Sequence, residues 1–109
     1  MQPVLRVVRD RTKRDEDTFE IIQARDVVMI ITVRESALAS SPALQWRVTF
    51  EFGRGLVAIT RMAETVAQAF QDAVTALEKA DPRGRLPSFT GGEWGIIRKA
   101  LDDECIFDP

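Results

Sequence analysis

Regular alternation of apolar and polar residues predicts an antiparallel β-sheet in the first half of the chain. The clearest alternation covers residues 44–52, where every second residue is large and apolar, from Leu44 to Phe52. The residues between them are polar: Gln45, Arg47, Thr49 and Glu51. Because successive side chains of a strand point to opposite faces, this pattern is typical of a strand with one buried and one solvated face.

Segments rich in aliphatic and β-branched residues predict four more strands, over residues 4–9, 18–23, 27–34 and 56–59. Pro3 precedes the first of them, and proline in sheets is confined mainly to edges, so we place this strand near an edge. The charged residues 10–17 predict a loop in which a basic run and an acidic run compensate each other.

The register between the second and third strands follows from the size of their side chains. A three-residue loop over 24–26 places Phe19 opposite Ile31 and Ile21 opposite Met29. A loop one residue shorter would place a glutamate opposite Ile31, because a one-residue slip turns every side chain of a strand to its other face. We therefore predict the three-residue loop.

A helical period replaces the alternation from about residue 61 and predicts a helix over 61–80. Its apolar stripe consists of Met62, Val66, Ala69, Phe70, Ala73, Val74 and Leu77. We expect Thr60 to cap its N-terminus. The helix should end near Asp81, because Pro82 restricts its predecessor and cannot continue the hydrogen-bond ladder.

A second helix is predicted over 91–103 by its own start signal. Thr90 and Glu93 have the spacing of a capping box, and Phe89 and Trp94 that of a hydrophobic staple. The order of strands and helices predicts one α+β domain over 1–109. Its antiparallel sheet of four to five strands is followed by two C-terminal helices packed on one face.

Composition then excludes several classes of function. The 109 residues are 45% hydrophobic and 29% charged, include no His and no Tyr and only one Cys, and are enough for one domain. The absence of His removes imidazole-dependent triads, and a single Cys cannot form an internal disulfide, so we expect a cytoplasmic protein. The longest apolar run, Val27 to Ile31, is far shorter than the roughly 20 residues of a membrane span.

Carboxylates are the only candidates for catalysis, and they cluster at 15–17 and 102–104. Both clusters lie in polar stretches, where neither member of an acid–base pair would be desolvated. A calcium loop starting at Asp15 fails because Phe19 occupies a ligand position. We therefore predict no catalytic, metal-binding or cofactor-binding residue and expect a protein that is not an enzyme.

The remaining candidate positions have simpler structural interpretations. Gly91 and Gly92 could present amides to an anion, but the capping box already uses this helix end. Gly53-Arg54-Gly55 is favoured as a turn, and Cys105 as a small buried apolar residue without a neighbouring base. The two tryptophans lie on apolar stripes and are expected in the core.

Charge argues weakly against nucleic acid as a partner. The formal net charge is −2, and Arg far outnumbers Lys, which a GC-rich genome also produces. In type the chain resembles small α+β proteins of bacteria and phages, without a shared motif. A nucleic-acid-binding module that uses Arg6, Arg34, Arg47 and Arg54 on the sheet is the alternative that we keep.

The second and third strands carry more aliphatic side chains than two helices can cover. Two helices cover about four strands, and on one side only. The residues Ile22, Val28 and Ile30 then point away from the helices, with Leu5 and Val7 adjoining them. Such apolar surface marks an association site. We predict binding of a second copy or another protein through Ile22, Val28, Ile30, Thr32, Arg34 and Arg47, unless the N-terminal strand or the 10–17 loop covers this patch.

Overall fold

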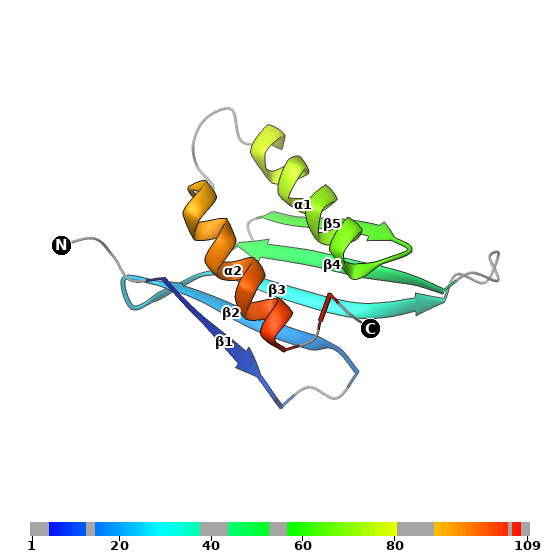
Figure 1. Cartoon of the computed structure of the whole chain (residues 1–109), viewed down its shortest axis with the longest axis horizontal. Helices are drawn as coiled ribbons and strands as arrows, with labels where there is room; N and C mark the ends of the chain where they lie inside the picture. The colour runs from blue at the N-terminus through cyan, green and yellow to red at the C-terminus, as the bar shows by residue number, and fades with distance from the viewer. Residues whose placement is uncertain are drawn as a thin grey trace.

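The chain folds into a five-stranded sheet followed by two helices (Figure 1). The computed structural model describes residues 5–12, 15–37, 44–52, 57–80, 89–104 and 106–107. The strands are β1 (Leu5–Asp10), β2 (Asp17–Gln23), β3 (Asp26–Ala37), β4 (Leu44–Phe52) and β5 (Val57–Ala63). The helices are α1 (Val66–Ala80) and α2 (Gly91–Asp103).

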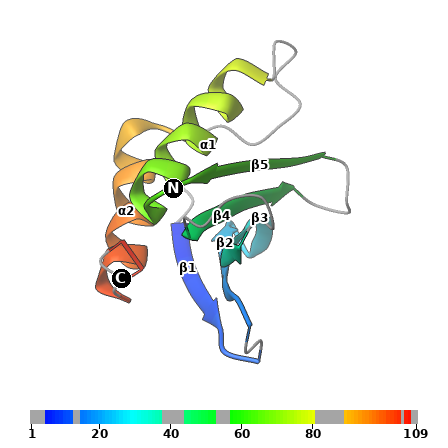
Figure 2. The ribbon, with the colours of Figure 1, turned by 90° about the vertical axis from the view of Figure 1, so that its right-hand side faces the viewer.

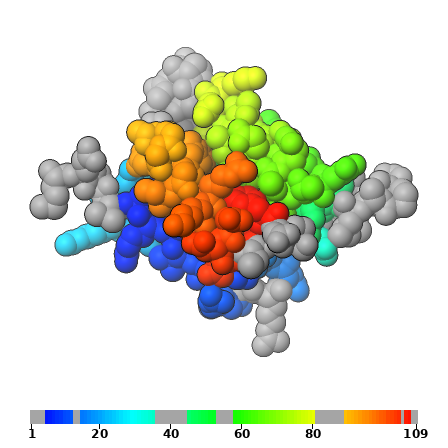
Figure 3. Space-filling view, in the orientation of Figure 1, coloured from blue at the N-terminus to red at the C-terminus, as the bar shows by residue number. Residues whose placement is uncertain are grey.

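The sheet is an antiparallel meander, with strand order β1-β2-β3-β4-β5. Both helices lie on the same side of it (Figure 2). In the space-filling view the two helices lie side by side on that face, with residues near the C-terminus between them (Figure 3). The predicted α+β architecture is confirmed.

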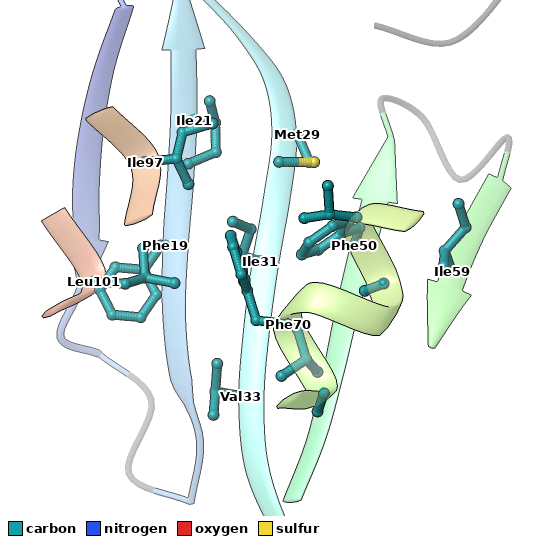
Figure 4. Close-up of a cluster of buried hydrophobic side chains, with 14 of the residues drawn as sticks. Phe19, Ile21, Met29, Ile31, Val33, Phe50, Ile59, Phe70, Ile97 and Leu101 are labelled. Carbon is teal, nitrogen blue, oxygen red and sulfur yellow. The ribbon is translucent and has the colours of Figure 1, made fainter. Parts of the chain in front are cut away.

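The hydrophobic core lies between the sheet and the helices. Every second side chain of the central strands points toward the helices and forms the sheet side of this core. Figure 4 shows Phe19 and Ile21 beneath Ile97 and Leu101 of α2, all of them buried. Phe50 of β4 is fully buried, and its ring centroid lies 5.6 Å from that of Phe70 and 5.8 Å from that of Trp94. Trp46 and Trp94 both pack on this core, as predicted.

The predicted register between β2 and β3 is confirmed, but its cause differs. Phe19 lies opposite Ile31 and Ile21 opposite Met29. The loop itself contains only Ala24 and Arg25, both with positive φ, and a register shift next to Ile21 restores the odd register. A two-residue turn followed by a β-bulge therefore produces the pairing that we assigned to a three-residue loop.

The boundary between β5 and α1 was predicted too early. β5 continues to Ala63, so Met62 lies in a strand, and Thr60 cannot be the helix cap. The hydroxyl of Thr65 fills that role, because it accepts a hydrogen bond of 3.1 Å from the amide of Gln68. Every residue of β5 is paired with β4, and this pairing extends the strand beyond the apolar residues that predicted it.

The start of α2 agrees with the sequence in every detail. The Thr90 hydroxyl accepts from the Glu93 amide at 3.1 Å, and the Glu93 carboxylate accepts from the Thr90 amide at 3.0 Å. The rings of Phe89 and Trp94 pack with centroids 5.0 Å apart. Glu93 also accepts a hydrogen bond of 2.8 Å from Gln23, which fixes the start of α2 against the end of β2.

Candidate functional site

The face of the sheet turned away from both helices, here called the open face, carries most of the residues predicted as a binding surface. Its side chains form rows that run across the strands, because register partners share a face. Three such rows cross the middle of the sheet. No helix or strand of the described chain covers them (Figure 2).

The central row consists of one aspartate and four threonines that are register partners on five successive strands: Asp10, Thr18, Thr32, Thr49 and Thr60. The hydroxyl oxygens of Thr49 and Thr60 are 3.1 Å apart and share a hydrogen bond. Thr18 is only 5% exposed although it lies on the open face. The middle of this face is therefore a continuous line of hydroxyl groups.

The rows on either side of the threonines carry opposite charges. On one side, Arg34 of β3 and Arg47 of β4 are direct register partners. On the other side, Ile30 is flanked by its two register partners, Glu20 and Glu51. Rows are two residues apart along each strand, so the arginine and glutamate rows are separated by about 13 Å.

A shallow hollow of about 270 Å³ joins these rows. It is lined by Asp10, Glu16, Thr18, Glu20, Ile30, Thr32, Arg34, Arg47, Thr49 and Glu51. Among the described residues, two buried side-chain atoms lack a hydrogen-bond partner, and both belong to this lining: Thr18 Oγ1 and Arg47 Nε. Buried polar atoms in proteins are nearly always hydrogen-bonded, so the hollow contains unused binding capacity.

The hollow brings together four of the six residues predicted as a binding surface: Ile30, Thr32, Arg34 and Arg47. Ile22 lies further along the open face, where its register partners are Arg6 and Val27. Ile30 has polar register partners, and the other apolar residues of this face lie beyond them: Ile22 and Val27 in the next row, and Val8 beside Glu20.

Val28 does not share the face of Ile30, because the β-bulge interrupts the alternation of β3. Val28 packs against the buried core, and Val27, which is 44% exposed, is the residue opposite Ile22. Leu5 and Val7 also pack against the core, beneath α2, and do not adjoin the open face as expected.

Sequence reasoning missed Thr18 and Glu20, although the signal was present. The predicted register already implies that Glu20 lies opposite Ile30 and Thr18 opposite Thr32. A search for aliphatic residues alone passed over these polar positions.

The two carboxylate clusters considered for catalysis are brought together by one arginine. Arg9 Nη2 lies 2.5 Å from Asp17, and Arg9 Nη1 lies 2.6 Å from Glu104 at the end of α2. The hydrogen bond with Glu104 is the main reason that the pKa of Arg9 is raised, although burial opposes it. The guanidinium therefore stays charged except in strongly alkaline solution, and it attaches α2 to β1 and β2 wherever Asp17 and Glu104 are ionised.

The other candidate positions lie at the start of α2, on the open face or outside the described residues. Gly91 and Gly92 open α2 as part of the capping box. Arg6 and both hollow arginines lie on the open face, whereas Gly53-Arg54-Gly55 and Cys105 are outside the described residues. In the described ranges, no three acidic or cysteine side chains are grouped to hold a metal ion, and neither helix is long and apolar enough to cross a membrane.

Comparison with family models, with curated proteins and with solved structures finds no match to this chain.

Proposed function

We propose that this chain is a cytoplasmic, non-enzymatic protein-binding module that forms a homodimer through the open face of its sheet. The observation that carries the proposal is the separation of charge across this face. Arg34 and Arg47 lie on one side of the threonine row, and Glu20 and Glu51 lie on the other. In the described residues, none of these four side chains forms an ion pair within its own chain.

This arrangement is complementary to itself under two-fold symmetry. An axis parallel to the threonine row, midway between two stacked faces, turns the arginine row of one copy onto the glutamate row of the other. β4 then faces β4, so Arg47 meets Glu51 of the second copy. Arg34 lies over Ile30 of the second copy, between Glu20 and Glu51 of that copy. Each contact occurs twice, as in any interface of this symmetry.

The size of the face predicts a weak dimer. Five strands at about 4.8 Å and about 20 Å of strand length give about 500 Å² per copy. A standard interface buries about 800 Å² per partner, so we expect a dissociation constant above about 1 µM. Ile30 supplies the apolar centre, and the threonines and charges form the rim.

Charge reversal tests the proposed geometry. Arg47→Glu should raise the dissociation constant at least tenfold, because two attractions become two repulsions and about 1.4 kcal/mol corresponds to tenfold. Glu51→Arg should do the same. An equal mixture of the two variants should associate again, because in the mixed dimer each position 47 meets an opposite charge at position 51.

Sedimentation equilibrium measures the dissociation constant of each variant and of their mixture. At protein concentrations up to about 1 mM it detects a dimer whose free energy of association is as weak as about −4 kcal/mol. Arg61→Glu is the matched control, because Arg61 is an exposed arginine outside the hollow and pairs with Val48 of the core-facing row. It should leave the dimer unchanged. A mixture that remains monomeric would overturn the proposed geometry, as would a chain that retains an oligonucleotide through Arg34 and Arg47 instead of associating.

A further inference from the structure

The arginine row is incompletely neutralised within one chain. Arg34 and Arg47 lie directly opposite each other on neighbouring strands, where two like charges destabilise a sheet. In the part of the chain that the structure describes, neither guanidinium group has an ion-pair or hydrogen-bond partner. A negatively charged group placed between them would convert this repulsion into two attractions.

Two buried donors point to the same kind of ligand. Thr18 Oγ1 and Arg47 Nε are buried, have no partner and line the hollow together. Each can donate a hydrogen bond: the guanidinium nitrogen can only donate, and the hydroxyl can rotate to do so. Each of the two atoms therefore calls for an acceptor, and arginines side by side bind oxyanions through several charge-assisted hydrogen bonds.

The size and the remaining charges of the hollow restrict the ligand further. Its volume of about 270 Å³ lies at the lower limit of small-molecule sites. Glu20 and Glu51 lie about 13 Å along the strands from the arginine row, and Asp10 already accepts two hydrogen bonds from Thr12. Glu16 also lines the hollow and precedes Asp17, the register partner of Val33, so it lies near Arg34. These acidic residues leave room for one small anion at the arginine end and disfavour an extended polyanion.

We propose that a small tetrahedral oxyanion, such as sulfate or phosphate, binds between Arg34, Arg47 and Thr18. Because Arg47 would otherwise meet Glu51 of a second copy, the anion competes with dimerisation. This competition rests on the proposed function, whereas anion binding to the single chain does not. The protein then alternates between two states: a monomer with the anion bound on its open face, and a dimer without the anion.

The binding step is tested on a chain that cannot pair, the Ile30→Arg variant, by following ¹H–¹⁵N signals of Arg47 Nε and the Thr18 amide. Sodium sulfate should shift both signals with saturation, and sodium chloride at equal ionic strength should not. Arg47→Gln and Thr18→Val, each added to this variant, should raise the apparent dissociation constant for sulfate at least tenfold. Arg61→Gln, the control, should not change it. Equal shifts with both salts would overturn the site.

The competition is tested on the unmodified chain by sedimentation equilibrium in the same two salts. Sulfate should raise the dimer dissociation constant at least threefold above its value in chloride at equal ionic strength. A dimer that forms equally in both salts while sulfate binds the variant overturns the competition alone. A chain that binds sulfate but is monomeric in both salts overturns the proposed function and leaves the anion site standing.

Discussion

Replacing Ile31 with Arg should unfold the chain, whereas the same change at the next residue, Ile30, should leave it folded. Ile31 is fully buried in the core, and a charged side chain there costs several kcal/mol in addition to about 2–5 kcal/mol of lost packing. This sum is comparable to the whole stability of a domain, about 5–15 kcal/mol. Circular dichroism and urea titration measure the difference.

Ile30→Arg places a basic side chain between Glu20 and Glu51 on the open face. We expect a change of about 1 kcal/mol or less in the free energy of unfolding, since surface substitutions have small effects. The dimer should be abolished, because position 30 faces Arg34 of the second copy and each of these two contacts becomes a repulsion. Ile30→Val is the matched control and should retain both fold and dimer. An Ile30→Arg chain that associates like the unmodified one would contradict the assignment of this face.

Phe50→Ala should lower the free energy of unfolding by about 3–5 kcal/mol. Phe50 is fully buried and is in ring contact with both Phe70 and Trp94, so its removal leaves a cavity between β4 and the two helices. Urea denaturation followed by tryptophan fluorescence measures the loss. Ile96→Ala, on the 51%-exposed residue of α2, is the control and should change stability by less than about 0.5 kcal/mol. Similar losses for both variants would contradict the description of the core.

The sequence was sufficient for the architecture because its local signals agree with the global packing. The alternation of residues 44–52 matches the bounds of β4, and the capping box at Thr90 and Glu93 marks the start of α2. The pairing of Phe19 with Ile31 was predicted because a one-residue slip would have buried a glutamate. In each case a wrong assignment carries a large energetic cost.

The details that the sequence did not determine are those in which tertiary pairing overrides local preference. Ala24 and Arg25 adopt positive φ without the glycine or asparagine that normally indicates this turn. The bulge that follows moves Val28 to the core side, and nothing in an aliphatic run reveals it. Met62 fits a helical stripe but is out of phase with the alternation of Val57 and Ile59, and only its pairing with Arg47 of β4 shows that it belongs to the strand.

The most direct measurement is an isotope-filtered NOE experiment on an equal mixture of labelled and unlabelled chain, at a concentration near 1 mM. A two-fold dimer through the open face predicts intermolecular cross-peaks from the Ile30 methyl groups to Arg34, and from Thr32 to Thr32 of the second copy. Intermolecular cross-peaks confined to the helices, or none at all, would contradict it.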